Sequence, residues 1–79
     1  FHMEDTIDEK IKNIFLKIFP DENDESFTME KKQSEFEDWD SFAHLQLVSA
    51  VEKEFGIRFD MDEVMNFTSP IDFVKYIDK

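Results

Sequence analysis

The chain has 79 residues, of which 41% are hydrophobic, and its nine basic and twenty acidic side chains give a formal net charge of −11. This length allows one small domain, and the apolar content is too high for an intrinsically disordered chain. Because cysteine is absent, disulfides, thiolate metal sites and a cysteine nucleophile are excluded. The charge repels nucleic acid and anionic lipid, so we expect no nucleic-acid partner and no membrane insertion. It either attracts basic partner proteins or serves only solubility.

The apolar runs are only a few residues long, too short for a secretory signal or a spanning helix. We therefore expect a cytoplasmic protein, and we expect it to be a monomer. One domain is predicted over residues 1–79, in which Phe1-His2-Met3 is a cloning remnant or a disordered start.

The segment from Thr6 to Phe19 has the pattern of an amphipathic helix. Thr6 can cap its N-terminus, Glu9 completes a capping box, and Pro20 ends the helix. Spacings of three and four residues place the apolar side chains on one face: Ile7, Ile11, Ile14, Phe15, Ile18 and Phe19.

A long acidic loop is predicted from Asp21 to Asp40, with a short helical turn around residues 34–37. A loop of this length is uncommon in a small domain unless it is functional or held in place. Four apolar side chains are expected to anchor it across the helix ends: Phe27, Met29, Phe36 and Trp39.

The loop begins with alternating polar residues that resemble a calcium-binding loop. Such a loop requires Gly at its sixth position and a bidentate Glu at its twelfth. Ser26 and Lys32 stand at those positions, so a solvated acidic loop is predicted instead.

The second helix is predicted from Ser41 to Phe55. Asp40 is a favoured N-cap, and Gly56, the only glycine, follows as a left-handed C-cap would, with Ile57 placed for the accompanying contact. A broad apolar arc on the helical wheel indicates packing against more than one neighbour. The arc is formed by Leu45, Leu47, Val48, Val51 and Phe55, with Phe42 near one edge.

Two further helices complete the prediction. A short one follows the cap Asp60 and extends to about Asn66, after an extended segment over residues 57–59. The last begins with Ser69 as cap and Pro70 at the first helical position. Its inner face is predicted to be Ile71, Val74 and Ile77, with Phe73 as a flanking apolar residue. The fold class is therefore all-α: a small four-helix bundle with three principal helices, one short helix and a long first loop.

Little in the sequence suits catalysis. There are two histidines, no Gly-rich phosphate loop and no zinc-ligand spacing. His44 lies one turn after Ser41, which suggests a Ser–His pair, but His44 falls within the apolar arc. A partly buried histidine bonded to the loop is the favoured interpretation. We predict no catalytic residue, no metal site and no enzymatic activity.

Ser41 is the most promising site, because a phosphate ester there would lie at a helix N-terminus, where free amides and the helix dipole favour negative charge. The stretch from Asp40 to Phe55, DSFAHLQLVSAVEKEF, resembles the motif helix of the acyl carrier protein family, in which the serine of Asp-Ser-Leu bears 4′-phosphopantetheine. The order of helices and loops across nearly the whole chain is also similar to that family.

The resemblance implies that a separate transferase moves phosphopantetheine from coenzyme A to Ser41, while Asp40 helps to present the serine. The arm would hold an acyl or aminoacyl group as a thioester and present it to a loading enzyme and to downstream synthases or transferases. Candidate partner contacts around the motif helix are Phe42, Leu45, Glu52, Glu54, Asp62 and Glu63. The alternative is an acidic helical adaptor that binds basic proteins without a prosthetic group.

Four positions depart from the pattern of fatty-acid-synthesis carriers. Phe42 replaces the motif leucine, and Ala43, Gln46 and Lys53 stand where those carriers commonly have acids. The exchange at Phe42 is a tolerable one between bulky apolar residues. The other three departures favour a specialised carrier, for an amino acid, a polyketide unit or a surface-glycan modification, over a housekeeping fatty-acid carrier.

Overall fold

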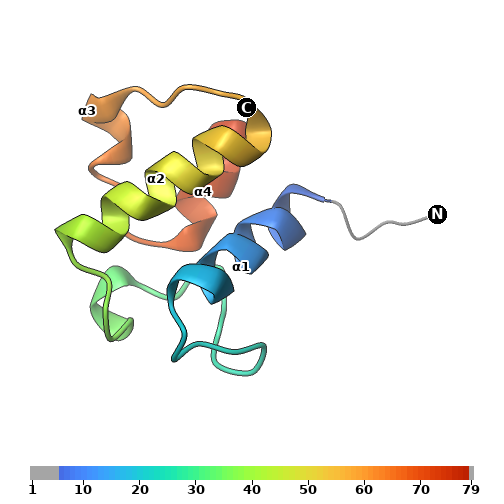
Figure 1. Cartoon of the computed structure of the whole chain (residues 1–79), viewed down its shortest axis with the longest axis vertical. Coiled ribbons are helices and arrows are strands. Elements are labelled where there is room, and N and C mark those ends of the chain that lie inside the picture. Colours follow the sequence, from blue (N-terminus) through green and yellow to red (C-terminus); the bar gives the residue numbers. More distant parts are fainter. Residues whose placement is uncertain (1–5, 79) are drawn as a thin grey trace.

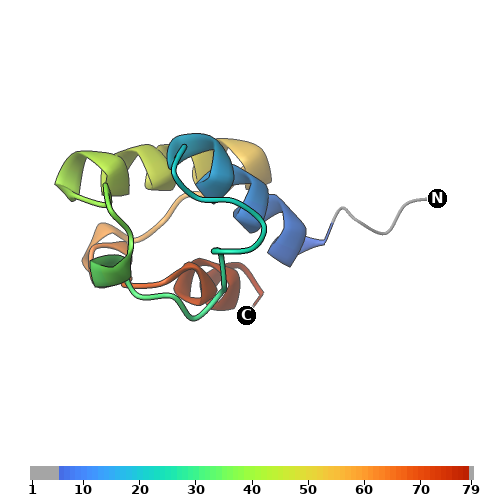
Figure 2. The ribbon, with the colours of Figure 1, turned by 90° about the horizontal axis from the view of Figure 1, so that it is seen from below.

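A computed structural model of the chain describes residues 6–78, so the expected remnant at Phe1-His2-Met3 lies outside it. The elements are α1 (Ile7–Ile18), the 3₁₀ helix η2 (Gln33–Glu35), α2 (Ser41–Phe55), α3 (Met61–Val64) and α4 (Pro70–Ile77), with no strand in this range. The all-α prediction, with three principal helices, one short helix and a long first loop, is confirmed. Helices α1 and α2 run antiparallel on one side of the molecule, and η2, α3 and α4 lie on the other (Figures 1 and 2).

The predicted helix starts of α1, α2 and α3 are confirmed. In each, the N-cap side chain accepts a hydrogen bond from a first-turn amide: Thr6 from Glu9 at 3.2 Å, Asp40 from Ala43 at 2.9 Å, and Asp60 from Asp62 at 2.9 Å. These bonds satisfy amides that the helices themselves leave without an acceptor.

Ser69 occupies the predicted cap position of α4, but its side chain makes no capping bond. Ser69 is buried, and its hydroxyl lies 3.5 Å from the Asp72 carboxylate. That carboxylate accepts the Thr68 amide at 2.9 Å. The predicted positions of Ser69 and Pro70 are therefore confirmed, but the amide at the start of α4 is bound by an acid inside the helix rather than by the serine side chain.

The C-terminus of α2 is closed by Gly56, as predicted. Gly56 adopts a left-handed conformation with φ of 64°, and the Ile57 amide reaches back to the Glu52 carbonyl at 3.1 Å. This is the geometry of a Schellman cap. It turns the chain so that the segment to α3 returns along the bundle.

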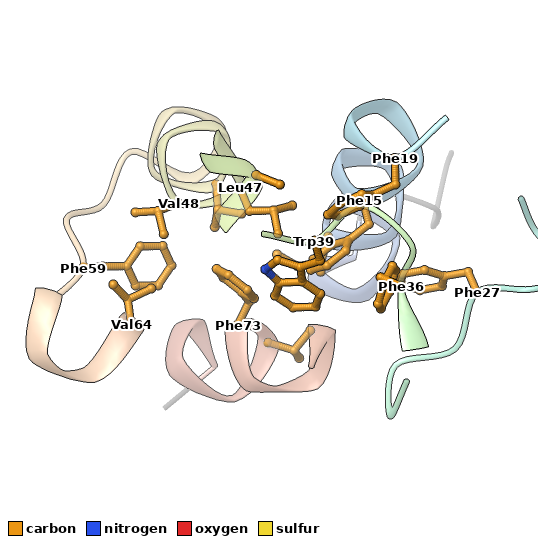
Figure 3. Packing of buried hydrophobic residues seen from close by; sticks show 14 residues of the cluster. Phe15, Phe19, Phe27, Phe36, Trp39, Leu47, Val48, Phe59, Val64 and Phe73 are labelled. Carbon is orange, nitrogen blue, oxygen red and sulfur yellow. The ribbon is translucent and has the colours of Figure 1, made fainter. Parts of the chain in front are cut away.

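The core is built around aromatic rings (Figure 3). Phe15 of α1 is fully buried, and ring centroids within 6.0 Å of its own come from Phe19, Phe27, Phe36, Trp39 and Phe73. Three of these rings belong to the long loop, and Met29 packs against the same core. The four predicted anchors therefore hold the loop against the bundle, and the prediction is confirmed.

A partly buried ion pair also holds the loop. The Lys31 ammonium lies 2.9 Å from both carboxylate oxygens of Glu22, and the two side chains are only 15% and 8% exposed. Ser26 donates its hydroxyl to the same carboxylate at 2.9 Å. Lys31 also lies over the ring of Phe36, 4.9 Å from its centroid. These contacts join the two halves of the loop.

The inner face of α4 was predicted correctly at Val74 and wrongly at the other positions. Phe73 is fully buried and Val74 is 8% exposed, whereas Ile71 and Ile77 are only partly buried. The Phe73 ring meets rings from other elements, including Phe59 and Phe67. Helix α4 turns its aromatic side chain inward because the largest apolar surface gains most from burial.

Three boundaries differ from the prediction by small amounts. Helix α1 ends at Ile18 with Phe19 as its C-cap, α3 ends at Val64 rather than near residue 66, and the turn predicted over residues 34–37 is η2 at Gln33–Glu35. Within residues 6–78, no helix has the length and apolar content needed to cross a bilayer.

Candidate functional site: the start of helix α2

Ser41 is the first residue of α2 and is exposed. Asp40 directs its carboxylate to the Ala43 amide, and its carbonyl accepts the His44 amide at 2.9 Å. Within the described part of the chain, the Ser41 hydroxyl and the amides of Ser41 and Phe42 have no hydrogen-bond partner. An exposed hydroxyl and two free N–H groups therefore lie together at the positive end of a 15-residue helix.

The surface beside Ser41 is apolar and acidic. Phe42 is 69% exposed and Leu45 is 49% exposed, so Leu45 belongs to the surface rather than to the inward arc predicted for α2. Asp62 and Glu63 are exposed on α3. We call these four residues the α2–α3 surface.

Two further apolar residues, Met61 of α3 and its C-cap Met65, are half exposed and were not predicted as site residues. Of the three apolar residues in this segment only Val64 is buried. Met61 and Met65 lie four residues apart and so share one side of the turn, and this spacing was the signal that could have identified the two methionines.

Two predicted partner contacts are engaged within the fold. The Glu52 carboxylate is half buried and accepts the Phe59 amide at 2.8 Å, which fixes the extended segment against α2. Glu54 lies 3.8 Å from the Lys10 ammonium, at the opposite end of α2 from Ser41. Because both acids are engaged elsewhere in the fold, we do not include them in the α2–α3 surface.

His44 is buried, and both of its ring nitrogens are engaged. The Trp39 indole N–H donates to Nδ1 at 3.0 Å, and Nε2 lies 2.8 Å from the Val64 carbonyl. Since Nδ1 accepts, the ring proton stands on Nε2 and is donated to that carbonyl. No ring nitrogen remains to activate Ser41. The prediction of a buried histidine bonded to the loop is confirmed, with α3 as a second partner.

The polar residues at the start of the loop have structural roles. The Asn23 side-chain oxygen accepts the amides of Glu25 and Ser26 at 2.8 and 3.0 Å, and Asp24 pairs with Lys12 at 3.0 Å. Across residues 6–78, no group of three or more His, Cys, Asp or Glu side chains is arranged to hold a metal ion.

A model of the protein family described as the phosphopantetheine attachment site matches residues 9–77, nearly the whole chain. The chain belongs to this family. No curated protein and no solved structure matches the chain at a significant level. Domains of this family bear 4′-phosphopantetheine covalently, so the resemblance to acyl carrier proteins and the predicted cofactor are confirmed.

Membership establishes a carrier role for the domain in general terms. Carrier domains are not catalytic themselves; they interact with transferases and synthases that act on the arm. The bound cofactor supplies a terminal thiol, which a chain without cysteine lacks. The residues at the start of α2 suit such a group, because they combine an exposed hydroxyl with amides that can face a phosphate. The adaptor without a prosthetic group is not favoured.

Proposed function

We propose that Ser41 is the residue to which phosphopantetheine is attached. The chain contains five serines, and the observation that distinguishes this one is an exposed hydroxyl without a partner in the first turn of α2. Ser69 is buried, and the Ser26 hydroxyl donates to Glu22. Ser34 and Ser49 are exposed, but Ser34 lies in a three-residue 3₁₀ helix and Ser49 in the middle of α2.

Charge complementarity supports the same serine. A phosphodiester on Ser41 would lie beside the two free amides at the start of α2, where the helix dipole favours an anion by about 0.3–1 kcal/mol. Mid-helix Ser49 has no such amides, because those around it bond within the helix. Asp40 holds the first turn in place through the Ala43 amide, which is our proposed role for the motif aspartate.

In the proposed reaction, a transferase joins the Ser41 oxygen to the phosphorus of the phosphopantetheine half of coenzyme A. The bond between that phosphorus and the pyrophosphate bridging oxygen breaks, adenosine bisphosphate leaves, and the serine proton goes to a base of the transferase. The chain itself contributes the exposed hydroxyl and the shape of the first turn of α2.

Incubation with coenzyme A and a broad-specificity phosphopantetheinyl transferase, followed by intact-mass measurement, tests the proposal. The wild-type chain is expected to gain one phosphopantetheine, and Ser41→Ala none. Ser49→Ala, on the same helix, is the matched control and is expected to react fully. Modification of Ser41→Ala, with its helical circular dichroism unchanged, would overturn the assignment.

We further propose that the arm shuttles a thioester-bound acyl or aminoacyl group in a specialised pathway, and that the protein acts in the cytoplasm. The sequence supports the specialised role through Ala43, Gln46 and Lys53, which replace acids common in fatty-acid-synthesis carriers. The two cargo classes are distinguished by testing which enzymes load the holo protein: adenylating enzymes that supply an aminoacyl group, or acyltransferases that supply an acyl group. Efficient loading by malonyl transferase and elongation by fatty-acid synthases would contradict the specialised role.

The α2–α3 surface is our proposed contact area for the transferase and the loading enzyme. Its exposed Phe42 ring and Leu45 side chain offer apolar burial, and its two acids favour encounter with a basic partner. Phe42→Ala is expected to slow modification of Ser41 about tenfold through a raised KM. Lys75→Ala, an exposed change on α4, is the control and is expected to leave the rate unchanged.

A further inference from the structure

A groove with basic walls lies between α1 and α2, at the opposite end of α2 from Ser41. Two adjoining hollows of about 310 and 450 Å³ share three lining residues, Ile14, Lys17 and Glu54, and so form one continuous groove. The remaining lining residues are Lys10, Asn13, Ile18, Ala50 and Lys53. Helices α1 and α2, which form the walls, run side by side and antiparallel in both views of the ribbon (Figures 1 and 2).

The charge of this groove is opposite to that of the molecule. Three lysines and one glutamate line it, in a chain whose net charge is −11. Lys17 and Lys53 are exposed, and within residues 6–78 neither has an ion-pair partner. Lys10 pairs with Glu54 at 3.8 Å and lies over the Phe55 ring, 5.6 Å from its centroid. Two lysines without an ion-pair partner in that range, Lys17 and Lys53, therefore line the groove.

The floor of the groove is aliphatic. Ile14, Ile18 and Ala50 are each partly buried, so each still presents apolar surface to an incoming side chain. A furrow between two antiparallel helices, with an aliphatic floor and charged rims, matches the shape and polarity of an amphipathic helix.

We propose that this groove binds an acidic amphipathic helix of a partner protein. Its aliphatic side chains would lie on Ile14, Ile18 and Ala50, and its carboxylates would pair with Lys17 and Lys53. Nucleic acid fits less well, because the floor of the groove offers no aromatic ring for base stacking.

The place of the groove gives it a function distinct from cargo transfer. Lys53 lies twelve residues after Ser41, which corresponds to about 18 Å along the helix axis. A helix bound there leaves Ser41 and the α2–α3 surface accessible. The groove would tether the carrier to a partner while its arm visits enzymes at the other end. Binding of the helix does not depend on which serine bears the arm, whereas the tethering role rests on the proposed attachment at Ser41.

A synthetic helix of about 15 residues is the probe, with leucines three and four apart and glutamates elsewhere. It is titrated into the isotope-labelled full chain while amide chemical shifts are recorded. The expected shifts lie in residues 13–18 and 50–54. Lys17→Glu with Lys53→Glu is expected to weaken binding about tenfold or more. Lys32→Glu with Lys75→Glu makes the same change of net charge outside the groove and is expected to change affinity less than about twofold.

The proposal is overturned if both double variants weaken binding equally, if the shifts map to the α2–α3 surface, or if binding does not saturate. It is also overturned if a peptide with lysine in place of glutamate binds as tightly. Displacement of the peptide by an oligothymidine or by vesicles containing anionic lipid would assign the groove to phosphate ligands instead. The four substituted lysines are exposed or half-buried surface residues, and Lys17→Gln with Lys53→Gln provides a milder pair if charge reversal disturbs the fold.

Discussion

His44 is the residue that joins three parts of the molecule near the proposed attachment site. Its ring accepts the Trp39 indole N–H and donates to the Val64 carbonyl, and all three residues are buried. His44→Leu leaves the buried Trp39 indole N–H without a partner, whereas the Val64 carbonyl still accepts the Phe67 amide at 3.1 Å. We therefore expect a loss of about 1–3 kcal/mol in the free energy of unfolding.

Urea denaturation of His44→Leu, His44→Gln and Gln46→Ala tests this role. Glutamine can donate and accept, so we expect it to recover part of the lost stability. Gln46 is exposed on the same helix, and its substitution should change stability by less than about 0.5 kcal/mol. Equal stability of the leucine variant and the wild type would show that the two hydrogen bonds of His44 make no net contribution to the free energy of unfolding.

The residues that sequence reasoning identified correctly are those whose signal is local. Asp40 and Gly56 adjoin the helix that they cap, so their roles follow from neighbouring positions. The bond from His44 to Val64 spans twenty residues, and no pattern in the sequence indicates it. The structural role of Glu52 was missed for the same reason. In the sequence it resembles a surface acid, but its carboxylate accepts the Phe59 amide seven residues away.

The loop between α1 and α2 contains Lys31 and Glu22, the least exposed ion pair among residues 6–78. Lys31→Met keeps the aliphatic stem over Phe36 but leaves the Glu22 carboxylate, 8% exposed, without a cation. We expect a loss of about 2 kcal/mol, which corresponds to a fall in Tm of about 8–16 °C for a domain of this size.

Lys12→Met is the matched control for the loop. Its partner Asp24 has a side chain that is 78% exposed, so the pair at 3.0 Å should contribute less than about 0.5 kcal/mol. Calorimetry of both variants measures the difference. A Tm shift for Lys31→Met no larger than that for Lys12→Met would mean that the aromatic anchors alone hold the loop.

The elements themselves were largely predictable, because α1, α2 and their caps have strong periodic and terminal signals. The inner face of α4 was not. In a helix of eight residues, the choice between Phe73 and Ile71 is decided by the shape of the core that other elements leave. The depth of the loop anchors likewise follows from the position of Phe15, which the sequence does not reveal.

On the scale of the whole molecule, the net charge of −11 should oppose folding through self-repulsion. Raising NaCl from about 0.02 M to about 0.5 M shortens the Debye length to a few ångströms and should increase the free energy of unfolding by about 1 kcal/mol. Urea midpoints at several salt concentrations measure the effect. Glu25 and Glu37 are both exposed, and the double variant Glu25→Gln with Glu37→Gln should have a stability that depends less on salt concentration. A fall in stability with added salt would instead show that ion pairs outweigh the repulsion.

The account as a whole depends on the arm being attached at the start of α2. Proteolysis of the holo protein, followed by fragmentation mass spectrometry, locates the modified residue among the five serines. We predict phosphopantetheine on Ser41 alone. Its detection on Ser34 or Ser49, with an unmodified Ser41, would contradict the account.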